Sequence, residues 1–565
     1  MSLPGLLQDG VFLLCVSLLV RPAGGYMARV FERKPTFLDR FLRPSEAALH
    51  RLMRVAPEQE MTWGEYASAF IVFSLCGTVF VYGLLRLQRF FPWHDAERIT
   101  TSMTPDLAFN TAVSFATTTT WQAYAGETTL SNWSQLVALA SQNFLAGAAG
   151  LSVAIAFLRG LTREKSAGLG NFWVDLVRAV LWILLPLSLL GSLLLVWQGV
   201  PVTFRSTTAL STLEGRAQVL VTGPVAPFEI IKNLGTNGGG FFNANGGHPY
   251  EAPTPLANSF HMLAIAVLPA SLTYTFGRLL GRPRHGWVLY GVMVALFIAG
   301  LAVCHRAETA GSPALRRAGL ELSGNLEGKE VRFGLEGSVL ATVTTSNGAT
   351  GSTNSGLDSY TPIGGMVPLV NMLLGEIAFG GLGTGLVGLL LVAFLGLFAA
   401  GLMVGKTPEY AGKTIGQTEM KLVMLYTLAS PLAVLVPTAL AVRTPAGLSA
   451  LTTNTGTHGF TEILFAFTSC FANNGQTFAG LAANSIFYNA ATVIAMMIGR
   501  FGLAVPALAL AGRFAAQGRR PETAGTFPTD SFLFALVVLG TALIVGALTF
   551  FPALCLGPIA EQLRS

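Results

Sequence analysis

Long apolar runs separated by short polar segments make up most of the chain. About 20 apolar residues in a helix, which rises ~1.5 Å per residue, cross the ~30 Å hydrocarbon core of a bilayer. Because many runs reach this length, the pattern predicts an all-α membrane protein rather than a barrel. We expect ten spans, at residues 5–26, 65–86, 132–158, 172–198, 255–280, 286–304, 363–405, 419–443, 484–512 and 530–554.

The seventh expected span, residues 363–405, is about twice the length that a bilayer requires. It contains five glycines between positions 375 and 385, and glycine weakens a helix interior. Broken helices occur in transporters where they line a cavity or are buried in protein. We therefore predict a break near residues 377–385.

Four short segments rich in Thr, Asn and Gly lie between pairs of expected spans, and each follows a stretch that favours a helix. The helix before the second segment, residues 227–234, would rise only ~12 Å and is too short to cross a bilayer. We expect Pro227 at its first position, where a missing N–H is tolerated. The helix before the first segment is expected to begin at Thr104, Pro105 and Asp106, which favour a cap, a first position and a first turn. The reference residues of the segments are 118, 114 and 124 positions apart; they are Thr118, Thr236, Thr350 and Asn474.

This near-constant spacing predicts four copies of one unit, made of a span, a half-helix, a polar segment and a second span. One extra span remains at each end. The expected parts are an N-terminal span at 1–30, repeats at 62–160, 170–282, 284–406 and 416–513, and a C-terminal span at 528–556. Four such units can surround a pseudo-fourfold axis, as four subunits do in a potassium channel.

A half-helix followed by an extended Gly-rich segment is typical of an ion selectivity filter, in which backbone carbonyls replace the hydration shell of a cation. Glycine allows φ of either sign, so successive carbonyls can point at one axis. A glycine-rich turn is the alternative for any single segment, but fourfold repetition favours filters. The segments contain no Asp or Glu, which favours a monovalent alkali ion over a divalent ion.

Composition supports a membrane protein and gives its orientation. Only 11% of the 565 residues are charged and the mean hydropathy is +0.57, whereas soluble domains carry roughly 25% charged residues. The net charge of +6 is typical of basic cytoplasmic loops, not of nucleic-acid binding. With ten spans, the basic clusters all fall on one side of the membrane, which is expected to be the cytoplasmic side; they lie at residues 29–54, 159–165, 278–284, 406–421 and 513–520. Both termini are then expected outside the cytoplasm.

Signatures of nucleotide hydrolysis are absent from the sequence. It contains neither a GxxxxGK(S/T) P-loop nor a DKTG phosphorylation motif. The largest loop, about residues 305–362, is too short for a nucleotide domain and is expected outside the cell. We therefore expect no catalytic residues and no bound nucleotide in this chain; if ATP drives transport, another chain hydrolyses it.

Several long and irregular motifs resemble the KdpA family, the potassium-translocating subunits of bacterial Kdp ATPases. They include LGTNGGGFFNANGGHPYEAPTPLAN at Leu234–Asn258, TPEYAGK at Thr407–Lys413 and HGFTE from His458. The resemblance implies a potassium transporter of four channel-like repeats in the bacterial inner membrane. It also implies a complex with the P-type ATPase subunit KdpB, with KdpC and with the small peptide KdpF, in which potassium from outside passes through an intramembrane tunnel to KdpB.

The same resemblance implies which residues coordinate potassium. They are Thr118, Thr119, Thr120, Thr236, Asn237, Gly238, Ala349, Thr350, Gly351, Asn473, Asn474 and Gly475. Gln122 would lie beside the first segment, and the loop with Lys406 and Lys413 would contact the ATPase subunit. The chain departs from the family in its TTTT first segment, in Ala349-Thr350 of the third, and in Lys406, which lacks the planar fork of the usual Arg.

Charged residues in or near span interiors are costly and usually paired. We predict that Glu376 and Arg500 form an ion pair that lines the path below the filter; a structural pair or an interfacial anchor is the alternative. An ordinary positive-inside role is the alternative for Lys406 and Lys413. Asp358, just outside a filter segment, is expected either to concentrate cations or to act as a solvated or capping group.

Two other functions stay open on the sequence. One is a stand-alone, channel-like potassium transporter of the same superfamily, driven by the membrane potential or a coupled ion. The other is a non-transporting membrane scaffold or receptor, for which substitutions in the filter segments would leave potassium uptake unchanged.

Overall fold

The computed structural model describes residues 3–93, 95, 98–320, 323–521 and 526–564. Within them, ten helical segments are long and apolar enough to cross a membrane, which confirms the expected number. They are α1 (Leu3–Phe31), α3 (Trp63–Arg86), Ser134–Ala140 with α6 (Ser141–Thr162), α7 (Phe172–Arg178) through α8 (Leu185–Trp197), α10 (Pro255–Leu279), α11 (Pro283–Ala310), α15 (Thr384–Val404), α16 (Gln417–Arg443), α19 (Ile486–Met497) through α20 (Leu503–Ala516), and α21 (Phe532–Leu554) through α22 (Ala560–Arg564).

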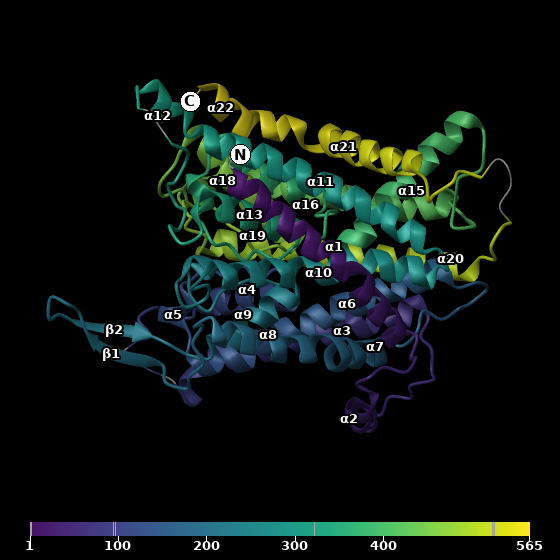
Figure 1. Cartoon of the computed structure of the whole chain (residues 1–565), viewed down its shortest axis with the longest axis horizontal. Helices are drawn as coiled ribbons and strands as arrows, with labels where there is room; N and C mark the ends of the chain where they lie inside the picture. The colour runs from purple at the N-terminus through teal and green to yellow at the C-terminus, as the bar shows by residue number, and fades with distance from the viewer. Residues whose placement is uncertain (1–2, 94, 96–97, 321–322, 522–525, 565) are drawn as a thin grey trace.

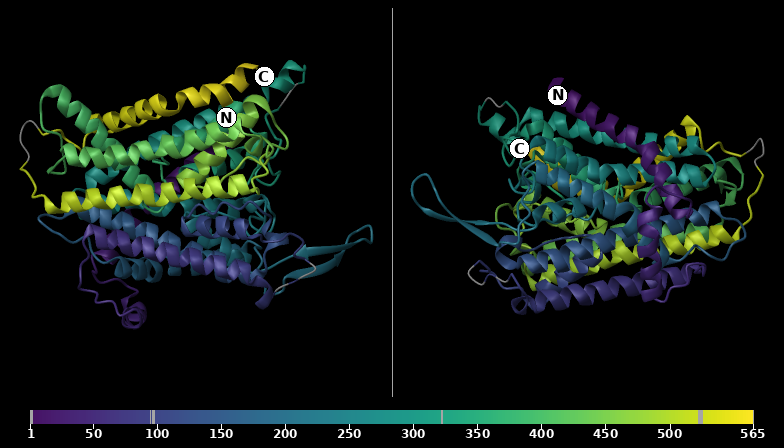
Figure 2. Two further views of the ribbon diagram at one scale, coloured as in Figure 1. Left: turned by 180° about the vertical axis from the view of Figure 1, so that it is seen from behind. Right: turned by 60° about the horizontal axis from the view of Figure 1, so that its bottom comes forward.

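The long helices run side by side along the longest axis of the molecule, and the two chain ends lie at the same end of this bundle (Figure 1). A hairpin of β1 (Thr207–Ser211) and β2 (Ala217–Val221) projects from that end, with Thr207 opposite Val221. The amphipathic helix α2 (Asp39–Leu52) lies at the opposite end, and the further views agree (Figure 2). The loop after α1 and the loop that carries the hairpin therefore lie on opposite sides of the expected membrane.

The spans differ in how far they are enclosed by the rest of the chain. In the most apolar stretch of Ser134–Thr162, 83% of the residues are buried, against 17% in that of Phe532–Arg564. The third span is therefore an inner helix, whereas α21 runs along the rim of the bundle (Figure 1). Exposed Leu and Ile side chains on α21 suit a surface that faces lipid.

Four helices that end inside the bundle precede the four polar segments: α4 (Pro105–Ala116), α9 (Val225–Leu234), α13 (Gly334–Asn347) and α18 (Gly456–Ala472). As expected, α4 has Thr104 at its N-cap and Pro105 at its first position. The expectation for the second helix is wrong in detail, because α9 begins at Val225 and Pro227 is its third residue. Proline is tolerated there since the first-turn N–H groups have no intrahelical acceptor.

The long seventh run is broken, as its glycines predict. α14 (Pro362–Leu373) ends before residues 374–383, and α15 begins at Thr384. In the break the backbone is left-handed at Gly375 and Gly383, and also at Glu376 (φ 54°) and Phe379 (φ 58°). A left-handed residue with a side chain costs roughly 1–2 kcal/mol, so neighbouring structure must hold this conformation.

Contacts with the polar segments hold the break in place. Gly381 N donates to Gly348 O (3.2 Å), and Leu382 N donates to Thr236 Oγ1 (2.9 Å). The break therefore lies directly beneath the second and third segments and joins two repeats.

Candidate functional site

The four polar segments share one backbone pattern. Each is a triplet that follows the C-terminal end of its short helix, with positive φ at the first and third residues and not at the second. The triplets are Thr118–Thr120 (φ 65° and 50°), Thr236–Gly238 (49° and 85°), Ala349–Gly351 (49° and 70°) and Asn473–Gly475 (57° and 88°). Five of these eight positive-φ residues carry side chains, and such strain persists only where the surrounding structure imposes it.

One hydrogen bond, common to all four, ties each triplet to its own helix. The N–H of the middle residue donates to the carbonyl five residues earlier: Thr119 to Ser114 (3.0 Å), Asn237 to Lys232 (2.9 Å), Thr350 to Thr345 (3.2 Å) and Asn474 to Ser469 (3.0 Å). Within the described residues, no main-chain N–H donates to the carbonyls of the four middle residues. Main-chain donors therefore leave these carbonyls available to an ion, whereas the hydroxyl of Thr120 contacts two of them, Thr119 O (2.8 Å) and Asn237 O (2.5 Å).

The third residue of each triplet abuts the middle carbonyl of the next triplet, and the four contacts close a ring. An ideal Cβ on Gly238 would lie 1.5 Å from Thr350 O; on Gly351 it would lie 2.1 Å from Asn474 O, and on Gly475 2.1 Å from Thr119 O. In the first triplet, Thr120 Oγ1 donates to Asn237 O (2.5 Å). The order is first to second, second to third, third to fourth and fourth to first, so the four segments surround one axis.

A small cavity of about 20 Å³ lies at the inner end of this ring. The first residues of all four triplets line it: Thr118, Thr236, Ala349 and Asn473. A volume of about 10–15 Å³ or more is enough to hold one water-sized particle. The cavity therefore suits one partly dehydrated ion directly below the ring.

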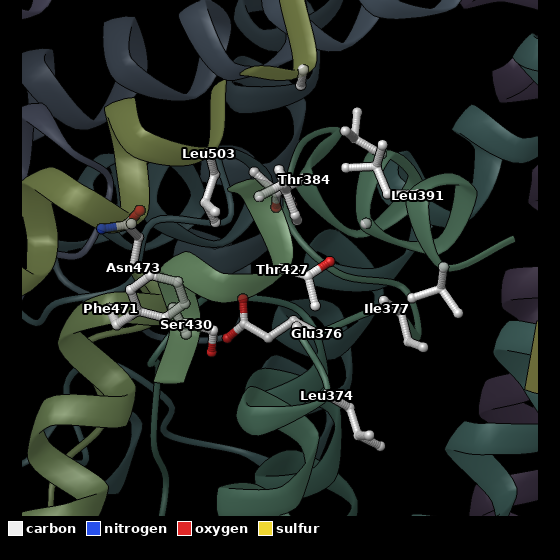
Figure 3. Close-up of a pocket in the computed structure, with 18 of the residues that line it drawn as sticks. Leu374, Glu376, Ile377, Thr384, Leu391, Thr427, Ser430, Phe471, Asn473 and Leu503 are labelled. Carbon is white, nitrogen blue, oxygen red and sulfur yellow. The ribbon is translucent and has the colours of Figure 1, made fainter. Parts of the chain in front are cut away.

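A larger cavity of about 160 Å³ adjoins the small one, and the two share Gly150, Thr384, Ala472, Asn473 and Arg500 as lining residues. It extends from the break between α14 and α15 to α16, α20 and α21. Its wall is mostly apolar, with polar groups from Glu376, Thr427 and Ser430 (Figure 3). A cation that leaves the ring would thus enter a space with few competing ligands.

The predicted ion pair between Glu376 and Arg500 is not formed, although both residues line the larger cavity. Glu376 Oε1 accepts from Asn474 Nδ2 (2.7 Å). Arg500 Nη1 donates to Thr118 Oγ1 (3.2 Å), and its Nη2 donates to Ala146 O (2.9 Å). Each charge is thus bonded to a different triplet, because the backbone places Glu376 against the fourth segment and Arg500 against the first.

These features together would suit a monovalent cation. The middle carbonyl of each triplet lies against a neighbouring triplet, the triplets contain no carboxylate, and a small cavity lies at the inner end of the ring. The C-terminal end of each short helix carries a partial negative charge that favours a cation at its tip. Coordination rather than net charge would then select the ion.

The KdpA family model, described as "Potassium-transporting ATPase A subunit", matches residues 10–563 of the chain. The chain belongs to the KdpA family. A protein of Granulibacter bethesdensis is 50% identical over 100% of this chain and 99% of its own length. A protein of Methylobacterium nodulans is 50% identical over 100% of this chain and 98% of its own length. Both are named "Potassium-transporting ATPase potassium-binding subunit".

The fold of this KdpA chain is similar to a known structure, the potassium transporter TrkH from Vibrio parahaemolyticus. The TM-score is 0.52 at 13% sequence identity, over 87% of this chain and 95% of the TrkH chain. At this identity the likeness concerns the fold alone. It agrees with the expected channel-like architecture of a multi-pass membrane protein.

Gln122 of this KdpA chain lies at the outer side of the ring and contacts the loop after the second triplet. Its Oε1 accepts from Gly240 N (2.8 Å), and its Nε2 donates to Gly240 O (3.3 Å) and to Tyr124 Oη (3.2 Å). Gln122 thus connects the chain just after the first triplet to the chain just after the second triplet.

The two candidate partner-contact lysines differ in their surroundings. Lys413 is buried, and its Nζ donates to Arg163 O (2.6 Å) and Gln517 O (2.7 Å). Its charge therefore ties together loops of this chain. Lys406 lies at an exposed position directly after α15.

Sequence reasoning missed a group of buried charges beside the second triplet. Lys232 on α9 contacts Glu229 (2.8 Å) and Glu251 (2.7 Å), and all three side chains are fully buried. It also missed Asn143 on α6, whose Nδ2 donates to Gly238 O (3.4 Å). A signal for the first group existed: Glu229 and Lys232 are spaced i, i+3 in a short helix expected at membrane depth, where charges are costly.

Proposed function

We propose that this chain binds potassium from outside the cell and passes it to the P-type ATPase subunit of an ATP-driven uptake complex. The observation that carries the proposal is the closed ring, in which each triplet abuts the middle carbonyl of the next. Such a ring offers main-chain oxygens from four directions to one ion. Membership of the KdpA family, whose model is described as "Potassium-transporting ATPase A subunit", supports the same conclusion.

The twelve residues of the four triplets are the proposed potassium ligands. The carbonyls of Thr119, Asn237, Thr350 and Asn474 form the central layer, since neighbouring triplets pack against them. The carbonyl of Asn237 also accepts the hydroxyl of Thr120. This layer is therefore asymmetric, because the hydroxyl of Thr120 lies within hydrogen-bonding distance of two of its four oxygens, those of Thr119 and Asn237.

The proposed path runs from the ring through the small cavity into the larger one. Arg500 lines both cavities, and its fixed positive charge would discourage a cation from resting at the junction. Glu376 lines the larger cavity (Figure 3). We propose that these two charges act separately, with Arg500 as a barrier and Glu376 as an attractive group.

The proposed partners are the ATPase subunit KdpB, KdpC and the small peptide KdpF, in the bacterial inner membrane with both termini outside the cytoplasm. Lys406 is the proposed point of contact with KdpB. Lys413 would position the loop that contains Lys406. The basic clusters near α2 and at the same end of the bundle support a cytoplasmic position for that end. The name of the relatives as ATPase subunits disfavours a stand-alone transporter.

Purification through a tag on this chain tests the proposal. We expect a P-type ATPase chain to co-purify at equal stoichiometry and its ATP hydrolysis to be stimulated by potassium only when this chain is present. Co-purification of a cytoplasmic nucleotide-binding ring would instead support the stand-alone transporter. Potassium uptake that is unaffected by any triplet substitution would support the scaffold.

A further inference from the structure

The second repeat contains a buried charged cluster that the other triplets lack at the equivalent place. Lys232 Nζ lies 2.8 Å from Glu229 Oε1 and 2.7 Å from Glu251 Oε2, with all three side chains at 0% exposure. We call Glu229, Lys232 and Glu251 the carboxylate–lysine cluster. His261 on α10 lies nearby, with its Nε2 3.9 Å from Glu229 Oε2.

The main chain of Lys232 is part of the second filter segment's support. Its carbonyl accepts from Asn237 N (2.9 Å) and Gly238 N (3.4 Å). The residues whose carbonyls do the same for the other middle residues are Ser114, Thr345 and Ser469. Three repeats thus place a small neutral hydroxyl residue at this position, whereas the second places a full positive charge.

The cluster holds the second segment from both sides. Lys232 lies on α9, which precedes the triplet, and Glu251 lies in the loop that follows it. Glu251 uses one oxygen for Lys232 and the other, Oε1, to accept from Phe242 N (2.8 Å). The ends of the segment from Lys232 to Phe242 are therefore tied through one carboxylate.

A buried ammonium near a cation site would repel the cation, since Coulomb interactions are weakly screened in a low-dielectric interior. The carboxylates of Glu229 and Glu251, which are ion-paired with Lys232, offset that repulsion. We propose that the carboxylate–lysine cluster is a positioning device for the second filter segment, whose acidic members also cancel the charge of Lys232 so that potassium can bind. This inference rests on the proposed function.

The first test is Glu251→Gln, which keeps an acceptor for Phe242 N and a similar shape but removes one negative charge. We expect the potassium concentration for half-maximal ATPase stimulation to rise about tenfold, which corresponds to about 1.4 kcal/mol. The maximal rate should change little, because the segment stays in place. The control is Lys329→Met, which breaks the similarly buried Lys329–Glu308 pair (2.7 Å) and should leave the half-maximal concentration unchanged.

The second test is the double variant Lys232→Met with Glu251→Gln. If charge cancellation matters, removing the ammonium should restore part of the potassium affinity that Glu251→Gln loses. A purely structural cluster would make the double variant as weak as the single one or weaker. That result, or an unchanged half-maximal concentration in Glu251→Gln, would overturn the proposal; absence of potassium stimulation in the wild-type complex would instead contradict the proposed function.

Discussion

Gly238 is the residue at which a single methyl group should be most damaging to the ring. Its φ is +85°, and an ideal Cβ would lie 1.5 Å from Thr350 O and 2.6 Å from Thr350 C. Cβ atoms essentially never come within 3.0 Å of a heavy atom outside their own residue and its chain neighbours. In Gly238→Ala the second and third triplets must therefore separate by more than 1 Å or one of them must leave its left-handed conformation, which itself favours glycine by roughly 1 kcal/mol.

We expect Gly238→Ala to weaken potassium binding by about 100-fold, because a misplacement of about 1 Å in a positioned group can cost that much. The measurement is the potassium dependence of ATP hydrolysis by the purified complex, repeated with rubidium and with sodium. Discrimination against sodium should fall, since a wider ring no longer sets the coordination distance. Gly238→Asp should be at least as severe because it adds a charge as well.

The matched control for this prediction is Gly247→Ala, in the loop after the same triplet. A Cβ there would lie 3.6 Å from its nearest neighbour, Asn354 O, which is ordinary van der Waals contact. We expect potassium dependence close to that of the wild type. If Gly238→Ala behaves like Gly247→Ala, the second and third triplets do not meet as the ring requires, and the reasoning is refuted.

Two further predictions concern charged side chains. Glu376→Gln keeps an acceptor for Asn474 and should change potassium affinity less than Glu376→Ala, which removes the shortest hydrogen bond of the Asn474 amide at a cost of about 0.5–1.5 kcal/mol. The amide then keeps only its longer bonds to Thr345 O (3.3 Å) and Ser346 O (3.4 Å). Equal potassium-dependence curves for the two variants would contradict this. Burial lowers the pKa of His458, but hydrogen bonds to Asp358 (3.0 Å) and Glu561 (2.8 Å) raise it to about 10. The folded-state pKa exceeds the usual 6.5, so this contribution to stability is complete below pH 6.5 and is lost as the pH rises towards 10. His458→Gln should therefore show a smaller fall in melting temperature than the wild-type complex between these pH values, and parallel curves would count against it.

The sequence was sufficient to predict features that depend on local pattern. Run length predicted ten spans, and the glycines near residue 380 predicted the break, which the structure places a few residues earlier, at 374–383. The helix start at Thr104 and Pro105 follows from capping preferences. The spacing of the polar segments predicted their equivalence, which their shared backbone pattern supports.

Features that depend on which side chains meet in three dimensions were not predictable in the same way. Glu376 and Arg500 were expected to pair, but the fold bonds Glu376 to a residue 98 positions away and Arg500 to one 382 positions away. Lys413 was expected to contact the ATPase subunit or to act as an ordinary positive-inside residue, yet its side chain is buried and donates to two carbonyls from distant parts of the chain. Pairing of this kind is set by tertiary packing and leaves no periodic signal.

A ring built by one chain can differ at each of its four positions, and this chain uses that freedom. Three third-position residues are glycines that have no room for a side chain, whereas Thr120 fills the fourth place and donates to Asn237 O. A ring of four identical subunits would need the same residue at all four places, so four such hydroxyls would compete with the ion for carbonyls. The Thr120 hydroxyl contacts Thr119 O (2.8 Å) and Asn237 O (2.5 Å), which belong to the first and second triplets. Because this donor is confined to the first repeat and the compensated lysine to the second, the ring is fixed on one side and the carbonyls of Thr350 and Asn474 have no hydroxyl donor in the part of the chain that the structure describes. The ion should therefore lie nearer to the third and fourth triplets, which offer carbonyls without a competing donor.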